Sequence, residues 1–338
     1  MAKVSVIGTT SWGTTLAMML ARKGAEVRLW ARTQEETLAL DSARENQRLL
    51  PGFPFPPGIH VTSSVVEATT GADVIILVVP SRSLRENVRG LLPHLDSRSI
   101  ILSATKGLEN ESAKRMSEVM EEELSEAFHS RISVLSGPNL AKEIAQGLPA
   151  STVVASQDEE VAMRVQELFM SSTFRVYTNT DVVGVELGGA LKNIIAIGAG
   201  ISDGLGYGNN GKAAFITRGL VEITRLGVSA GANPLTFAGL AGLGDLVTTC
   251  YSPLSRNRYL GEQLAAGRSL EGILSSMSNI AEGVDTTLGA LKLASDLNVD
   301  MPLTQAISTV LFQGMDPRQA VIGLMDRAPR PEWSGIQL

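Results

Sequence analysis

The chain has 338 residues, 44% of them hydrophobic, and a net charge of −6 from 29 Lys+Arg against 35 Asp+Glu. This length predicts about two domains, and the lack of any run of basic residues argues against a nucleic-acid partner. The single cysteine, Cys250, excludes an internal disulfide and predicts a reducing, cytoplasmic location. The three histidines lie far apart, so we expect no metal site. We also expect no membrane span, since no apolar run reaches ~20 residues, and no signal peptide.

The N-terminal half alternates predicted strands with predicted helices. Helices are predicted over residues 14–23 and from about Thr33, and the proline-rich segment 51–58 is predicted to be a loop. The strands are predicted at residues 3–7, 26–30, 73–79, 99–104, 132–136, 152–155 and 174–177. This alternation is typical of an α/β fold with a doubly wound, mostly parallel Rossmann sheet. After about Asp181 only helical periodicity remains. We therefore predict a dinucleotide-binding Rossmann domain over residues 1–180 and an all-helical catalytic and substrate domain over 181–338.

The turn after the first strand reads Gly8-Thr9-Thr10-Ser11-Trp12-Gly13 and occupies the place of a dinucleotide-binding G-x-G-x-x-G motif. In that motif the glycines let the backbone approach the pyrophosphate, which lies at the N-terminus of the following helix. Thr10 replaces the middle glycine, so the pattern alone is weak. The strand before it and the helix after it supply the context that the motif requires.

The second strand is followed by Ala31, Arg32 and Thr33, where NAD-binding domains usually carry an acidic residue for the ribose hydroxyls. Arg32 can pair with a 2′-phosphate, stack on an adenine, or simply be an exposed arginine at a helix start. The position favours NADPH without excluding NADH.

Two further motifs, SATKGLE (residues 103–109) and SGPNLAKE (residues 136–143), each follow a predicted strand. Lys106 and Gly137 therefore fall at the carboxyl ends of strands, where open α/β sheets bind ligands. The turn at 136–139 can offer backbone N–H groups to a polar substrate, or can only cap the next helix.

In the helical half, the segment 185–214 places one lysine, Lys192, and Asn193 among many glycines and alanines. Glycine inside a helix costs ~1 kcal/mol relative to alanine, so these glycines indicate close approach by a neighbouring helix or by a ligand. Two interpretations remain open. Either a cofactor lies against this helix beside Lys192, or the helix is tightly packed and Lys192 extends out to water.

Two other positions in this half suit charged ligands. Ser255 opens a predicted helix with Arg256, Asn257 and Arg258 behind it, which makes either an anion site or an ordinary helix cap. Glu282 is either an acid for ribose hydroxyls or a charge at a helix N-terminus.

From end to end, the chain resembles the bacterial NAD(P)-dependent glycerol-3-phosphate dehydrogenases. The segments that carry the resemblance are VIGTTSWGTTLA, VVPS, SATKGLE, SGPNLAKEIAQGLP, ELGGALKNIIAIGAGISDG, GLGDLVTTC, SRNR and AEGV. That family usually has glycine in place of Thr10, and often serine or threonine in place of Asn139. The resemblance implies a Rossmann domain followed by an all-α domain of the 6-phosphogluconate-dehydrogenase type.

The resemblance also implies a reaction and its residues. The reaction is reversible hydride transfer between nicotinamide C4 and C2 of dihydroxyacetone phosphate or sn-glycerol 3-phosphate, supplying glycerol 3-phosphate for glycerophospholipid synthesis. The implied catalytic residues are Lys192, as general acid/base, Lys106 and Asp245. The implied substrate contacts are Lys106, Gly137, Asn139, Lys192, Asp245, Ser255, Arg256 and Asn257. The implied contacts to NADPH or NADH are Gly8, Ser11, Trp12, Gly13, Arg32, Thr33, Lys106, Ala141, Arg256, Ile280 and Glu282.

Burial of Lys192 beside a second cation such as Lys106 would lower its pKa towards neutral pH.

Two rival functions remain open. A dehydrogenase of another β-hydroxyacid would lack the SRNR anion site, and a nucleotide sensor would need neither lysine nor Asp245. The expected partner is a small phosphorylated substrate. A homodimer is one form of assembly that the sequence allows.

Overall fold

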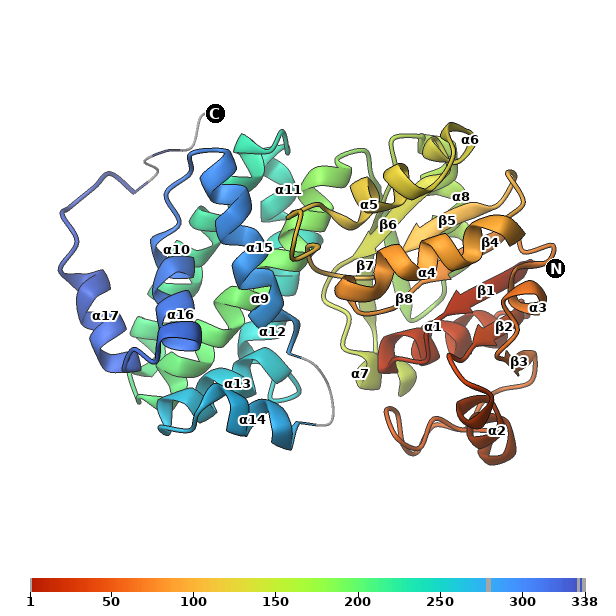
Figure 1. Ribbon diagram of the computed structural model, residues 1–338, viewed down its shortest axis with the longest axis horizontal. Helices are drawn as coiled ribbons and strands as arrows, with labels where there is room; N and C mark the ends of the chain where they lie inside the picture. Colours follow the sequence, from red (N-terminus) through yellow and green to blue (C-terminus); the bar gives the residue numbers. More distant parts are fainter. Residues whose placement is uncertain (1, 278–280, 333–334, 336–338) are drawn as a thin grey trace. The chain divides into compact units, whose positions relative to one another are not determined.

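The computed structural model describes residues 2–277, 281–332 and 335. The chain divides into two compact units (Figure 1). The first consists of Met1–Thr105 and Met116–Val182, and the second of Lys106–Arg115 and Val183–Leu338. The predicted division near residue 180 did not include this exchange, in which a short segment leaves the first unit and joins the second.

An eight-stranded sheet forms the centre of the first unit. The strands are β1 (Lys3–Ile7), β2 (Glu26–Trp30), β3 (Ile59–Thr62), β4 (Val74–Leu77), β5 (Ile100–Ser103), β6 (Ile132–Ser136), β7 (Ala150–Ala155) and β8 (Phe174–Asn179). Their order is β3-β2-β1-β4-β5-β6-β7-β8. Strands β1 to β6 are parallel, whereas β7 pairs antiparallel with β6 and parallel with β8. The predicted α/β fold with a mostly parallel Rossmann sheet is confirmed.

Helices cover both faces of this sheet (Figure 1). They are α1 (Ser11–Arg22), α2 (Gln34–Ala43), α3 (Val65–Thr69), α4 (Leu84–Leu91), α5 (Met116–Glu123), α6 (Glu126–His129), α7 (Ala141–Ala145) and α8 (Glu159–Phe169), with short 3₁₀ turns at Ser81–Ser83 and Leu92–His94. Side chains of β4 alternate between two cores, because successive residues of a strand point to opposite faces. Val74 and Ile76 pack in the core with α1, α7 and α8, and Ile75 and Leu77 in the core with α3, α4 and α5.

Strand β3 was not predicted. It is only four residues long, it follows the proline-rich loop, and it forms one edge of the sheet. Its pattern has a single exposed residue, His60, between buried neighbours. Four residues with one polar position are too few for strand periodicity to stand out from loop sequence.

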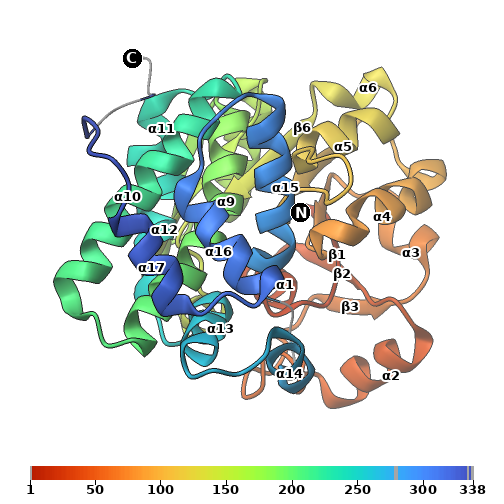
Figure 2. The same ribbon diagram turned by 60° about the vertical axis from the view of Figure 1, so that its left-hand side comes forward.

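The second unit is helical (Figures 1 and 2). Its elements are α9 (Val182–Gly204), which begins at the last residue of the first unit, α10 (Gly208–Ser229), α11 (Pro234–Ala238), a π turn η3 (Leu240–Gly244), α12 (Asp245–Tyr251), α13 (Arg256–Ala265), α14 (Leu270–Ser276), α15 (Glu282–Asp296), α16 (Pro302–Gln313) and α17 (Pro317–Met325). Both views show α9 surrounded by other helices of the unit. Helix α9 has the length and hydropathy of a membrane span, but 89% of its most apolar window is buried inside the protein. This is the environment of a core helix.

The segment Lys106–Arg115 belongs with the helices because its contacts are there. Leu108 is 1% exposed and packs in the helical core, where its Cβ would lie 3.1 Å from a Cβ added to Gly289 of α15. At the other end of the segment, the Arg115 guanidinium pairs with Glu186 of α9 at 2.6 Å. Lys106, the first residue of the segment, is thereby fixed in the helical unit.

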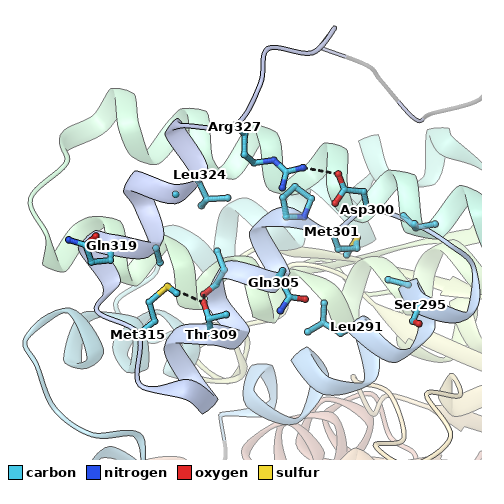
Figure 3. A pocket seen from close by; sticks show the side chains of 16 residues that line it. Leu291, Ser295, Asp300, Met301, Gln305, Thr309, Met315, Gln319, Leu324 and Arg327 are labelled. Carbon is cyan, nitrogen blue, oxygen red and sulfur yellow. Dashed lines mark hydrogen bonds and ion pairs between the residues drawn. The ribbon is translucent and has the colours of Figure 1, made fainter.

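A cavity of about 470 Å³ lies between α15, α16 and α17 (Figure 3). Its wall is largely apolar, with Leu291, Met301 and Leu324, and the Arg327–Asp300 ion pair lies at its edge. None of the predicted site residues lines it.

Candidate functional site

Two lysines from distant parts of the chain share one buried carboxylate. Lys192 Nζ, on α9, donates a hydrogen bond to Asp245 Oδ1, on α12. Lys106 Nζ donates to Asp245 Oδ2 at 2.6 Å. Lys192 is 6% exposed and Asp245 is 1% exposed. The interpretation in which Lys192 extends out to water is therefore wrong. The three predicted catalytic residues thus lie together in the helical unit.

Thr249 completes the surroundings of the Lys192 ammonium group. Its Oγ1 accepts a hydrogen bond from Lys192 Nζ at 2.8 Å and donates one to the backbone oxygen of Asp245 at 2.7 Å. Asp245 and Thr249 are one helical turn apart and therefore share a face of α12. The sequence analysis missed Thr249, although the D-x-x-x-T spacing at the start of a helix is a signal for such a pair.

The electrostatics of this cluster favour proton transfer near neutral pH. The pKa of Lys192 is lowered from its ordinary value to about 8: burial lowers it most, the Asp245 charge opposes this, and the neighbouring Lys106 charge adds to the lowering. A lysine with a pKa near 8 holds a proton at neutral pH and can also release it, as a general acid/base must.

Neighbouring protein segments explain two of the glycines of α9, Gly188 and Gly198. A Cβ on Gly188 would lie 2.6 Å from the backbone oxygen of Ala241 in η3, and one on Gly198 would lie 2.1 Å from the Phe215 ring of α10. Both distances are far below van der Waals contact. At these positions the close approach is therefore made by the packing of the helical unit.

The SRNR motif begins α13. Ser255 is the N-cap residue, and its Oγ accepts the backbone N–H of Arg258. Arg258 is already engaged, by Asp203 at 2.7 Å and Glu262 at 2.8 Å. Arg256 is exposed, and within the described part of the chain no hydrogen bond or ion pair of its side chain is found. Of the two arginines, Arg256 is the one available to an anion at this helix N-terminus.

Asn257 bonds within the protein. Its Nδ2 donates to Asn193 Oδ1 of α9 at 3.0 Å, and its Oδ1 accepts the backbone N–H of Gly283 in α15 at 3.0 Å. Asn257 is 7% exposed and Asn193 is 5% exposed. This chain of amides joins the helices that carry Lys192, Arg256 and the start of α15.

Glu282 is the first residue of α15. Burial raises the pKa of its carboxyl group, whereas Arg256, Lys106 and Lys192 lower it. Glu282 therefore interacts electrostatically with both lysines of the cluster and with Arg256. Ile280, the neighbouring predicted cofactor contact, lies outside the described residues.

The turn after β1 has the backbone of a dinucleotide-binding loop. Gly8 has φ +118°, and a Cβ there would lie 2.5 Å from the backbone oxygen of Val78. A Cβ on Gly13 would lie 2.2 Å from the backbone oxygen of Gly8. Thr10, by contrast, has φ −60° and acts as the N-cap of α1, with its Oγ1 accepting the Gly13 N–H. The glycines that this turn needs, Gly8 and Gly13, are present. Thr10, which replaces the middle glycine of the motif, has a backbone conformation that a threonine can adopt.

The first residues of α1 bear on the fit of a dinucleotide. The Ser11 hydroxyl donates to the backbone oxygen of Leu49 at 2.7 Å. The indole Nε1 of Trp12 is buried without a hydrogen-bond partner among the described residues. A buried donor without a partner costs free energy. Together with the two crowded glycines at the N-terminus of a helix, this donor fits a bound dinucleotide.

A carboxylate that the sequence analysis missed lies near the end of β2. Thr33 caps α2 by accepting the Glu36 N–H, and the Glu36 carboxylate accepts the Arg32 N–H at 3.3 Å. It also accepts the hydroxyl hydrogen of Thr9, in the glycine turn, at 2.5 Å. The T-x-x-E spacing is a capping-box signal and could have indicated this carboxylate. The Arg32 side chain itself is exposed.

The second predicted turn of the first unit is also held by its neighbours. Gly137, after β6, has φ +151°, and a Cβ there would lie 3.0 Å from the Thr152 Cα. Asn139 Oδ1 accepts the Thr152 hydroxyl at 2.9 Å. Ala141 begins α7, and its backbone oxygen accepts the Thr15 hydroxyl of α1 at 3.2 Å. The side chain of Asn139 therefore serves at least to fix this turn to β7.

Comparisons with known proteins agree along the whole chain. Residues 3–162 match the model of the NAD-dependent glycerol-3-phosphate dehydrogenase N-terminus, and residues 181–322 match that of its C-terminus. Glycerol-3-phosphate dehydrogenase [NAD(P)+] of Dehalococcoides mccartyi is 52% identical over 336 residues, covering 99% of this chain and 94% of the relative. The enzyme of the same description from Chlorobium phaeobacteroides is 50% identical over 98% of this chain and 99% of the relative.

A solved structure gives the same result for the fold. The crystal structure of glycerol-3-phosphate dehydrogenase from Coxiella burnetii has a TM-score of 0.92 and 38% identity, covering 96% of this chain and 99% of that one. These matches extend over both units. The chain belongs to the NAD-dependent glycerol-3-phosphate dehydrogenase family.

Proposed function

We propose that the protein catalyses the reversible, NAD(P)-dependent interconversion of sn-glycerol 3-phosphate and dihydroxyacetone phosphate. The observation that carries this proposal is the buried Asp245 carboxylate shared by Lys192 and Lys106, in a chain of this family. A steady-state assay with dihydroxyacetone phosphate and NADPH or NADH tests it directly. Absence of turnover with either nucleotide would overturn it.

The bound nicotinamide nucleotide supplies the hydride donor or acceptor for C2 of the substrate. The proton at the C2 oxygen is the task of the chain's own residues. Lys192 delivers it in reduction and removes it in oxidation, and its pKa of about 8 suits both directions. Lys106 places a second positive charge at the developing alkoxide, and the charge of Asp245 holds both ammonium groups in place.

The substrate phosphate is proposed to lie at the N-terminus of α13. Its partners would be Ser255 and Arg256, where the helix dipole and a free guanidinium favour an anion. The amide of Asn257 is used by Asn193 and Gly283, so Asn257 would act mainly through its backbone and through the position of the turn. Gly137 and Asn139 of the first unit are proposed as further substrate contacts.

The cofactor contacts are proposed from both units. In the first unit, the pyrophosphate would lie at the start of α1. The proposed contacts are Gly8, Ser11, Trp12, Gly13, Arg32, Thr33 and Ala141 from the first unit, and Lys106, Arg256, Ile280 and Glu282 from the second. The crowded glycines and the unpartnered Trp12 indole support the first group.

The remaining proposals concern the use of the product, the cellular compartment and the oligomeric state. The product glycerol 3-phosphate would feed glycerophospholipid synthesis, and the enzyme would work in the cytoplasm as a homodimer. The buried free thiol of Cys250 supports a reducing compartment. Light scattering of the purified protein tests the assembly, and a mass of one chain would exclude the dimer.

Arg256→Ala should raise KM for dihydroxyacetone phosphate about ten- to a hundred-fold, because a charge-assisted hydrogen bond to phosphate contributes roughly 1.5–3 kcal/mol. Activity on unphosphorylated dihydroxyacetone should change little. Arg268→Ala, on an exposed arginine in the turn between α13 and α14, is the matched control. Equal losses on both substrates would show that Arg256 does not bind the phosphate.

Arg32→Asp should weaken the binding of NADPH more than the binding of NADH, by on the order of 2 kcal/mol, because attraction to the 2′-phosphate becomes repulsion. The new carboxylate would lie next to that of Glu36, which already contacts Thr9 of the glycine turn. The measurement is kcat/KM for both nucleotides in wild type and variant. Arg48→Ala, on an exposed arginine whose guanidinium pairs with Glu36, serves as the control. Parallel losses for the two nucleotides would mean that Arg32 only stacks on the adenine.

A further inference from the structure

An ion network lies beside the proposed phosphate-binding turn, in residues that the proposed reaction does not use. Asp203 Oδ2, on α9, accepts hydrogen bonds from Lys212 Nζ and from Arg258 Nε, both at 2.7 Å. Lys212 is 5% exposed, and its ammonium group lies 4.3 Å from the centre of the Tyr251 ring. Arg258 also pairs with Glu262, one helical turn later, at 2.8 Å. Asp203 is the group that joins α9, α10 and α13 in this network.

Helices α9 and α13 also touch backbone to backbone. A Cβ on Gly200 would lie 1.9 Å from the backbone oxygen of Arg258, and a Cβ on Gly261 would lie 1.9 Å from the backbone oxygen of Ile197. No side chain fits at either position. This crossing fixes the middle of α13 against α9, and the Asp203–Arg258 pair adds a second point of attachment in the first turns of α13.

Asp203, the second point of attachment, lies on the face of α9 that also carries Lys192. Lys192 and Asp203 are eleven residues apart, about three helical turns, so their side chains point in nearly the same direction, roughly 16 Å apart along the axis. The guanidinium of Arg258 is held by two carboxylates, whereas that of Arg256, two residues earlier, is free for an anion. One rigid helix therefore carries both the proton-transferring group and the anchor of the phosphate-binding turn.

We propose that Asp203 is a positioning residue for substrate phosphate recognition. By holding Arg258 it fixes the first turn of α13, so that the Ser255 cap and Arg256 meet the phosphate while C2 lies at Lys192. Helix ends fray when nothing holds them, and a pre-ordered site binds more tightly because less freedom is lost on binding. This inference rests on the proposed function, and adds a residue that acts through Arg258 without touching the substrate.

The test is Asp203→Asn in the full-length enzyme. We expect KM for dihydroxyacetone phosphate to rise about tenfold, since misplacement of a binding group by about 1 Å has effects of this order or larger. Turnover at saturation should change less than about twofold. The kcat/KM for unphosphorylated dihydroxyacetone should be unchanged, and inhibition by inorganic phosphate should weaken in the same proportion as KM rises. A merely structural loss would lower activity on both substrates alike.

Three variants make the outcome decisive. Arg258→Lys keeps the charge but loses the fork that reaches both carboxylates, so it should reproduce the effect of Asp203→Asn, and it decides the matter if that variant does not fold. Glu262→Gln and Lys212→Met each remove another ion pair of the network while the Asp203–Arg258 pair stays, and both should keep KM within about twofold.

The failure of this inference can be told from failure of the proposed function. If Arg256→Ala raises KM for the phosphorylated substrate while folded Asp203→Asn and Arg258→Lys do not, the positioning role of Asp203 is overturned and the function stands. If wild type shows no preference for the phosphorylated substrate, the proposed function itself is overturned.

Discussion

Lys192→Met should lower kcat in both directions by at least ~10²–10⁴-fold, the contribution typical of a general acid/base. Methionine fills nearly the same volume but cannot carry a proton, so the C2 oxygen loses its donor and its nearest positive charge. Binding of NADPH or NADH, followed by fluorescence titration, should stay within about twofold. We expect the melting temperature to stay at or above that of wild type, since a buried ammonium group is removed and Asp245 keeps its pair with Lys106.

The matched control is Lys212→Met, which removes a buried lysine of the same unit that is paired with Asp203 and takes no part in the proposed chemistry. It should keep kcat within about twofold. Wild-type turnover in folded Lys192→Met would show that another group moves the proton. An equal loss of turnover in Lys212→Met would show that the effect comes from burial of charge and not from catalysis.

The sequence predicted the architecture well because the first unit follows the simplest periodic patterns. Strands β1, β2 and β6 begin and end at the predicted residues, since each is an apolar run between turn residues. What periodicity could not provide is contact between segments far apart in the chain. Lys106 meets Asp245 across 139 residues of sequence, and no local pattern encodes that meeting.

The candidate site was predicted by residue type more than by geometry. Of the two interpretations of the glycine-rich helix, the second was right about tight packing, since the glycines at 188 and 198 pack against protein, and wrong about Lys192, which is buried. A cofactor beside Lys192 stays a prediction. The two arginines of SRNR look equivalent in sequence, but the structure separates them, because Asp203 and Glu262 engage only Arg258. Such differences depend on which side chains the fold brings near, and therefore needed the structure.

Asp245→Asn should lower kcat by roughly 10²-fold or more, and should also change its pH dependence. Asp245 is 1% exposed and provides the negative charge for two lysines. Removing one partner from a buried ion pair lowers the free energy of unfolding by about 3–5 kcal/mol, because the remaining charge stays buried without compensation. Asparagine keeps the shape and one acceptor oxygen, so it separates the loss of charge from the loss of volume.

The direction of the pH change follows from the pKa of Lys192. In wild type this pKa is about 8, so reduction of dihydroxyacetone phosphate, which needs the protonated lysine, should fall as pH rises through about 8. Oxidation of glycerol 3-phosphate, which needs the neutral lysine, should rise over the same range. The Asp245 charge raises this pKa, whereas Lys106 lowers it. Without Asp245 the pKa of Lys192 must fall, and both profiles should move to lower pH.

The measurement is kcat/KM against pH in both directions, for wild type and Asp245→Asn. Thr249→Val is the matched comparison, because it removes an uncharged partner of Lys192 from the same helix face and should move the midpoint far less. A variant that is only less stable would lose activity at every pH without moving the midpoint. A midpoint that stays near pH 8 in folded Asp245→Asn, or moves upward, would show that the titrating group is not Lys192 under the charge of Asp245.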